Sequence, residues 1–132
     1  MGAHHHVALH ITEDGWTGKT DRGDTLAIGA SEGTFRPYEL LLLALASCLQ
    51  STFEDVAEKM KLSWSSADVD VQGDKRDEVP TTLESCCVSA RVTNASDEQK
   101  VKKAFDIATR YCSIYQTIAQ VARMEWEISF SD

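Results

Sequence analysis

The residues of this chain that could carry the most kinds of chemistry are its four cysteines, Cys48, Cys86, Cys87 and Cys112. A cysteine thiolate is both a nucleophile and a metal ligand, and two thiols that meet can cycle between dithiol and disulfide. Cys86 and Cys87 are adjacent, so in a strand their side chains point to opposite faces and cannot bind one ion together. The sequence has no C-x-x-C pair and no histidine near a cysteine. We therefore expect neither a metal nor another cofactor.

Cys48 and Cys112 are the candidates for a working pair. A free cysteine on an apolar helix usually packs as a small hydrophobic side chain, and this structural role is the alternative for each of them. A disulfide cycle instead needs a second thiol close enough to trap a sulfenic acid before it oxidises further. Cys48 shares a helix face with Leu45 and Thr52, and Cys112 continues the inward stripe of the next helix. Both thiols can therefore reach one cleft, whereas Cys86 and Cys87 are expected to be structural.

Cys48 lies in the middle of a long predicted helix. Pro37 is favourable as a first helical residue, and neither glycine nor proline occurs from Tyr38 to Lys61. The first half, from Leu40 to Ala46, is apolar nearly all round, which is typical of a helix buried on several sides. A single chain of 132 residues with few other helices cannot cover such a helix, so we expect a dimer.

The remaining helices and strands are predicted from capping boxes, from turn residues and from the alternation of apolar and polar residues. Ser96 with Gln99 and Ser113 with Gln116 predict the starts of two further helices, which end near residues 111 and 121. The expected strands cover residues 5–11, a segment after a turn at 15–18, and residues 25–28, 63–72, 83–93 and 126–130. The first three should form an antiparallel meander. The order of elements predicts an α+β fold with one domain over residues 1–132.

Charge and hydropathy narrow the functional classes. The net charge of −8 argues against nucleic acid or an anionic membrane as a partner, because phosphate contacts need a basic surface. The longest apolar run, Leu40 to Ala46, is far shorter than the roughly 20 residues of a membrane-spanning helix. The N-terminus lacks a basic region followed by an apolar stretch, so we expect no signal peptide and a cytoplasmic location.

Two segments of the sequence resemble the motifs of the OsmC/Ohr proteins. Residues 37–48 begin with proline and a glutamate and continue through an Ala/Leu-rich run into Cys48, which is similar to the central-helix motif of that family. Residues 108–114 contain Tyr-Cys-Ser-Ile and resemble its second motif, at a helix end. The likeness in element order extends from about residue 7 to 130, and the less characterised OsmC-like branch of redox proteins is the most similar.

The resemblance implies a fold and an activity. The fold would have antiparallel sheets packed on a long central helix in an intertwined homodimer, with active sites near the subunit interface. The activity would be a thiol-dependent peroxidase for organic or inorganic hydroperoxides, acting in oxidative stress defence with an unknown dithiol reductant. Carried over by position, Cys48 would be the peroxidatic thiol and Cys112 the resolving thiol.

The sequence departs from the family pattern near the start of the motif. The well-studied peroxidases have a glutamate directly after the proline, where it holds an arginine beside the thiolate. Here that position is Tyr38, and the acid, Glu39, follows one residue later. Arg22, Arg36 and Lys19 are the candidate activating cations. Tyr38 favours the alternative of a non-catalytic dimer that binds a small ligand or senses redox state.

The environment of each thiol can also be anticipated from its place in the sequence. With Ser113 as a cap, the Cys112 thiol would lie near a helix N-terminus, which favours a thiolate. Cys48 lies in mid-helix without such help, so it would need an arginine. We therefore predict a Cys48 thiol that titrates near its ordinary value.

Overall fold

The computed structural model describes residues 2–132 and divides into two compact units. The first unit ends at Leu41, and the second covers Leu42–Asp132. The two units together contain two three-stranded sheets and three helices, which is an α+β composition. The α+β class is therefore confirmed, whereas the expectation of a single domain stays a prediction.

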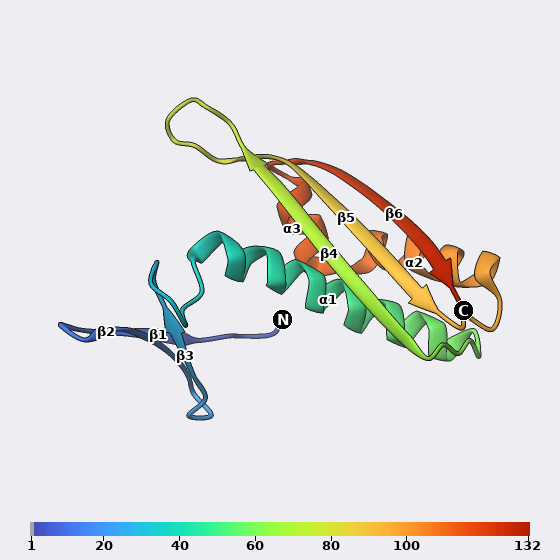
Figure 1. Cartoon of the computed structure of the whole chain (residues 1–132), viewed down its shortest axis with the longest axis horizontal. Helices are drawn as coiled ribbons and strands as arrows, with labels where there is room; N and C mark the ends of the chain where they lie inside the picture. Colours follow the sequence, from blue (N-terminus) through green and yellow to red (C-terminus); the bar gives the residue numbers. More distant parts are fainter. Residues whose placement is uncertain (1) are drawn as a thin grey trace. The chain divides into compact units, whose positions relative to one another are not determined.

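The first unit contains a three-stranded antiparallel meander (Figure 1). Its strands are β1 (Val7–Thr12), β2 (Gly15–Thr20) and β3 (Thr25–Ile28). The predicted meander is confirmed, but the turn expected over residues 15–18 lies at residues 13 and 14 instead. Gly15 begins β2 with a φ of 138°, a backbone conformation that glycine adopts without steric cost.

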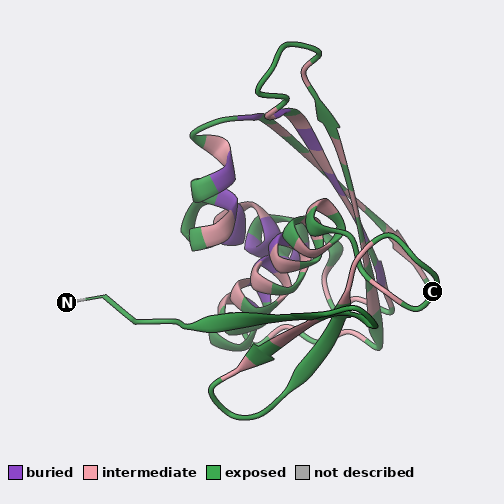
Figure 2. Cartoon of the chain, turned by 90° about the vertical axis from the view of Figure 1, so that its left-hand side faces the viewer, coloured by how far each residue is buried: buried purple, intermediate pink, exposed green. Residues whose placement is uncertain are grey.

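One face of this sheet is apolar and remains uncovered. The register places Ile11 opposite Trp16, and Trp16 opposite Ile28, on a face that also includes Val7 and Leu9. Val7 and Ile11 are 73% and 61% exposed, and no residue of the three strands is buried (Figure 2). The alternation of apolar and polar residues along the strands thus produces an apolar sheet face, but the described residues of this chain do not bury it.

Helix α1 (Pro37–Lys59) runs from the first unit into the second, close to the predicted bounds. At its start the Arg36 amide donates a 2.8 Å hydrogen bond to the Glu39 carboxylate. This contact satisfies one of the donors that a helix N-terminus leaves free. Two residues after the end of the helix lies a left-handed residue, Lys61, with a φ of 58°.

Within the second unit α1 has one fully buried face. That face consists of residues spaced four apart: Leu45, Leu49, Phe53 and Ala57. By length and composition alone α1 could also cross a membrane, but the core helix of a soluble protein passes the same test. Leu41 and Leu43, earlier in the helix, are exposed.

The second unit places helices on one face of a three-stranded sheet (Figures 1 and 2). The sheet consists of β4 (Ser66–Lys75), β5 (Leu83–Thr93) and β6 (Arg123–Ser131), and the helices that follow β5 are α2 (Glu98–Tyr111) and α3 (Ser113–Ala119). β4 and β5 are antiparallel as expected, but β6 pairs parallel to β5. The helix pair between β5 and β6 is a crossover connection, which brings the chain back in the same direction.

An aromatic chain joins the helices to the strands. The ring of Phe53 in α1 lies 4.9 Å from that of Trp64 and 5.7 Å from that of Phe105 in α2. Phe105 in turn lies 5.3 Å from Trp126 in β6. Tilted pairs at these separations are favourable. The result is a packed core that holds α1 and α2 against the sheet.

Both predicted capping boxes are wrong in their capping residue. The cap of α2 is Asp97, whose carboxylate accepts a hydrogen bond from the Lys100 amide at 3.1 Å. The Ser96 hydroxyl instead accepts from the Ser63 amide at 3.0 Å, a contact between distant segments. The cap of α3 is Cys112 rather than Ser113.

Candidate functional site: two thiols at a helix junction

The structure brings Cys48 and Cys112 together within the second unit. Cys48 is half-buried in α1, next to the fully buried Leu49. Cys112 is fully buried and forms the single-residue junction between α2 and α3, with φ −67° and ψ 115°. Both are free thiols, and their side chains interact, which lowers the pKa of Cys48 and raises that of Cys112. The two side chains are therefore neighbours, and the catalytic roles expected for them stay predictions.

The backbone of Cys112 is held by both helices that it joins. Its amide donates to the Ala108 carbonyl at 2.8 Å, and its carbonyl accepts from the Gln116 amide at 3.0 Å. The Gln116 side chain also donates to the Thr109 carbonyl at 2.9 Å, so α3 is tied back to α2. The Cys112 sulfur accepts from the Tyr115 amide at 3.4 Å, where a capping oxygen usually stands. Three hydrogen bonds therefore hold Cys112 itself, and a fourth ties together the two helices that it joins.

The two thiols titrate differently. Burial by itself raises the pKa of Cys48, but hydrogen bonds from the Ile114 amide, the Cys112 thiol and Ser113 outweigh it, and the pKa lies below its ordinary value. The pKa of Cys112 is raised, first by burial and then by its contact with Cys48, despite the Tyr115 amide. Cys48 is therefore the thiol that ionises first.

Two expectations about these environments are wrong. Cys48 does have help, because the first turn of α3 points hydrogen-bond donors at its sulfur. Cys112 does not become the favoured thiolate, because it is fully buried and donates to its neighbour. Sequence reasoning assigned the helix N-terminus to the cysteine beside it, whereas the fold directs that terminus at a cysteine 65 positions away in the chain.

The other two cysteines lie apart from this pair on β5. Cys86 is buried on the face toward the helices, and Cys87 is half-buried on the opposite face, as the alternation predicts. Burial, and then the neighbouring Cys87, raise the pKa of Cys86. The pKa of Tyr115 is raised by burial first and then by Cys86. In residues 2–132 no group of three or more His, Cys, Asp or Glu is arranged to hold a metal ion.

The candidate activating residues belong to the first unit. Arg22 forms a 3.2 Å ion pair with Asp24, and both side chains are largely exposed. Glu39 caps α1 by accepting from the Arg36 amide. Within α1 Glu39 precedes Cys48 by nine residues, which is roughly 13 Å of helix rise, so its carboxylate does not reach that sulfur along the same helix. The structure thus assigns Glu39 a capping contact at the start of α1, and a role of Arg22, Arg36 or Glu39 in activating Cys48 stays a prediction.

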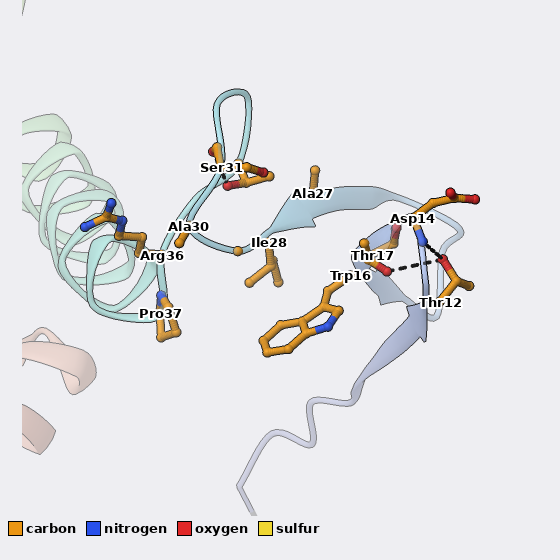
Figure 3. A pocket seen from close by; sticks show the side chains of 13 residues that line it. Thr12, Asp14, Trp16, Thr17, Ala27, Ile28, Ala30, Ser31, Arg36 and Pro37 are labelled. Atoms are coloured by element: carbon orange, nitrogen blue, oxygen red, sulfur yellow. Dashed lines mark hydrogen bonds between the residues drawn. The ribbon is translucent and has the colours of Figure 1, made fainter.

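The first unit has a cavity beside Trp16 (Figure 3). It has a volume of about 830 Å³ and is lined by Trp16, Ile28, Pro37, the candidate cation Arg36 and several short polar side chains. The Thr12 hydroxyl at its rim accepts from the Asp14 amide at 3.1 Å. No cysteine lines this cavity.

Sequence reasoning missed two residues of the site, Ser113 and Ile114. Both contribute hydrogen bonds to the Cys48 sulfur. The only available signal was their place directly after Cys112 at the start of a predicted helix, where amides lack intrahelical partners.

Comparisons with known proteins identify a family and a fold. A family model described as OsmC-like protein matches residues 29–127. No curated protein sequence matches the chain. Among solved structures, an OsmC-like protein from Mycoplasma pneumoniae superimposes with a TM-score of 0.86 at 18% identity, with 100% of each chain covered.

Two further structures carry a functional description. An organic hydroperoxide resistance protein OsmC from Legionella pneumophila has a TM-score of 0.75 at 15% identity, with 98% of each chain covered. The organic hydroperoxide resistance protein OhrB of Bacillus subtilis has a TM-score of 0.68 at 17% identity, covering 96% of this chain and 98% of that one. At such identities the likeness establishes the fold.

Proposed function

This chain belongs to the family of OsmC-like proteins, and from that membership and its thiol pair we propose that it is a thiol-dependent peroxidase. The substrates would be organic or inorganic hydroperoxides, and the role would be defence against oxidative stress. The observation that carries the proposal is the contact between a thiol of lowered pKa, Cys48, and a thiol of raised pKa, Cys112.

The proposed cycle has three steps. The Cys48 thiolate attacks one oxygen of ROOH, so that an S–O bond forms, the O–O bond breaks, and the alkoxide takes up a proton to leave as ROH. The Cys112 sulfur, on losing its proton, attacks the resulting sulfenic acid, and a disulfide forms as water leaves. A dithiol reductant then exchanges with the disulfide, restores both thiols and becomes a disulfide itself.

The difference between the two thiols suits these separate roles. The first step needs a thiolate, and the donors around Cys48 favour one. The second needs a protonated partner that remains beside Cys48 until the sulfenic acid forms, and the buried, hydrogen-bonded Cys112 meets that need. Immediate contact makes capture of the sulfenic acid faster than further oxidation.

We also propose that the working form is a homodimer in the cytoplasm. The uncovered apolar face of β1, β2 and β3 supports a dimer, because a face of this kind is costly to leave in water. Leu41 and Leu43 of α1 are also exposed. A second copy of the chain would supply apolar surface to cover both.

The second candidate function is a non-catalytic dimer that binds a small ligand or senses redox state. Tyr38 favours it, since it occupies the place where the related peroxidases have the acid that holds an arginine. In that case Cys48 and Cys112 would oxidise slowly, without turnover. The peroxidase is the better supported candidate because donors other than arginine already act on Cys48.

The experiment that separates these functions is peroxide consumption in the presence of a dithiol. Wild-type protein should consume cumene hydroperoxide or hydrogen peroxide through many turnovers, and Cys48→Ser should reduce the rate to background. Cys87→Ser is the matched control, because this thiol lies on the other side of the sheet. Wild-type protein that shows oxidation of Cys48 but no turnover would support the redox-sensing alternative.

A further inference from the structure

The turn between β1 and β2 contains the only Asp-Gly dipeptide of the sequence, Asp14-Gly15, and the sequence has no Asn-Gly. Residues 13 and 14 form this turn, and every residue from Thr12 to Trp16 is exposed. Gly15 has a φ of 138°, and a Cβ atom placed on it would meet nothing within 4 Å beyond its chain neighbours. The Gly15 nitrogen therefore follows Asp14 in an open part of the surface, and no side chain of its own hinders an approach to it.

The side chain of Asp14 takes no part in holding the turn together. The Thr12 hydroxyl accepts a hydrogen bond from the Asp14 amide at 3.1 Å and donates one to the Gly15 carbonyl at 3.4 Å (Figure 3). Both contacts use backbone groups of the turn. The Asp14 carboxylate forms no hydrogen bond or ion pair with any other of residues 2–132. It can therefore rotate toward the peptide bond that follows it.

The other two aspartates of the first unit differ from Asp14 in both respects. The Asp21 carboxylate lies 2.7 Å from Nδ1 of His6, and the Asp24 carboxylate forms a 3.2 Å ion pair with Arg22. Neither of these aspartates is followed by glycine. Within the first unit Asp14 alone combines a free carboxylate with a glycine as the next residue.

We propose that Asp14 is a site of spontaneous backbone modification, where the aspartyl residue converts to isoaspartate. The Gly15 nitrogen attacks Cγ of the protonated Asp14 carboxyl, a C–N bond forms, and the hydroxyl leaves with the amide proton as water, which closes a succinimide ring. Water then adds to the main-chain carbonyl carbon of Asp14, breaks its bond to the Gly15 nitrogen and returns a proton to that nitrogen. The chain afterwards runs through the Asp14 side chain, and the former main-chain carboxyl is free.

The modified turn is one main-chain atom longer than the original. The length of a hairpin loop fixes the register of its strands, which here pairs Thr12 with Gly15 and Ile11 with Trp16. An added methylene in the main chain should therefore disturb the pairing nearest the turn. The new carboxylate is also the group to which isoaspartyl methyltransferases transfer a methyl group, so it can be detected selectively.

The test is the accumulation of isoaspartate in the full-length protein during incubation at neutral pH and physiological temperature. It is measured by methyl transfer from S-adenosylmethionine with an isoaspartyl methyltransferase, followed by peptide mapping. Wild-type protein should gain methyl-accepting sites with time in the peptide that contains Asp14. Asp14→Glu keeps the charge but would need a six-membered ring, so the signal should be lost. Asp24→Glu is the matched control and should accumulate isoaspartate as wild type does.

A synthetic peptide of residues 8–20 separates the chemistry of the dipeptide from the effect of the fold, because it cannot form the three-stranded sheet. Peptide and protein should accumulate isoaspartate at similar rates, since no described residue holds the Asp14 carboxylate. Isoaspartate in the peptide but not at Asp14 of the protein would overturn the proposal, and so would a signal that persists in Asp14→Glu. Neither measurement involves peroxide or Cys48, so both are independent of the proposed function.

Discussion

The side chains of Cys112 and Cys48 interact, and this interaction moves the pKa values of the two thiols in opposite directions. The contact lowers the pKa of the acceptor and raises that of the donor. Two chemically identical side chains thereby become different: Cys48 is prepared to ionise, and Cys112 keeps its proton. The predictions below follow from this asymmetry and from the packing that maintains it.

Cys112→Ser should stop the cycle after the first step. Its hydroxyl cannot form a disulfide, so one equivalent of peroxide should convert Cys48 to a sulfenic acid that persists and reacts with dimedone. The mass increase of the dimedone adduct on the Cys48 peptide measures this. In wild-type protein the adduct should be minor, because Cys112 captures the sulfenic acid first. An equal yield in both proteins would mean that Cys112 is not the resolving thiol.

Cys112→Ala should make Cys48 harder to ionise. The alanine removes the Cys112 side chain, which lowers the pKa of Cys48. The pKa of Cys48 should therefore rise, and its alkylation rate should reach the alkaline plateau at a higher pH than in wild type. Cys112→Ser keeps an O–H donor and should show the smaller change. The comparison is made by iodoacetamide labelling between pH 6 and 10, and identical profiles for all three proteins would contradict the thiol–thiol contact.

The protein should lose stability at alkaline pH under reducing conditions. Burial is the main cause that raises the pKa of Cys86 and of Cys112 in the folded state. A group whose folded pKa is raised contributes stability that is fully present below its unfolded pKa and is lost as the pH rises above it. The loss should therefore begin near pH ~8.5, where unfolded cysteines ionise.

Cys86→Ala is the variant that tests this dependence. It removes one of the two raised thiols, so the midpoint of urea unfolding should fall less steeply between pH 8 and 10 than in wild type. Cys48 has the opposite sign, since its lowered pKa adds stability as the pH rises toward its unfolded value. If the midpoint of urea unfolding falls equally steeply with pH in wild type and in Cys86→Ala, Cys86 does not contribute to the loss of stability.

Phe53→Ala should destabilise the second unit severely. Phe53 is 1% exposed and contacts the rings of Trp64 and Phe105, so its removal leaves a cavity between α1, α2 and the sheet. We expect a loss of about 3–5 kcal/mol in the free energy of unfolding, measured by urea denaturation. Glu54→Ala, at the adjacent exposed position, should change that free energy by less than ~0.5 kcal/mol.

Ile11→Asp should dissociate the proposed homodimer. Ile11 is 61% exposed on the apolar face of the first sheet, where a partner would cover it and a buried carboxylate would be costly. Multi-angle light scattering should therefore report a monomer for Ile11→Asp. His10→Asp, on the opposite face of β1, should remain dimeric. A monomeric wild-type protein at low micromolar concentration would remove the dimer proposal altogether.

Sequence patterns sufficed for the elements that depend on local rules. The alternation over residues 83–93 predicts β5 at its observed bounds, and the proline at position 37 marks the observed start of α1. These periodicities place apolar side chains on one face of an element, so the period and the residues that end each element suffice to locate it. The two cysteines that meet could be selected in the same way, because each continues the apolar stripe of a helix.

Only the tertiary structure decided which hydrogen bonds form between those elements. Ser96 matches a capping box, yet its hydroxyl bonds the Ser63 amide, and Asp97 caps α2. The donors for Cys48 come from Ser113 and Ile114, far away in the chain. A hydrogen bond depends on a few tenths of an ångström and on direction. Sequence periodicity reports which face a residue occupies, whereas that precision arises only when separate segments pack together.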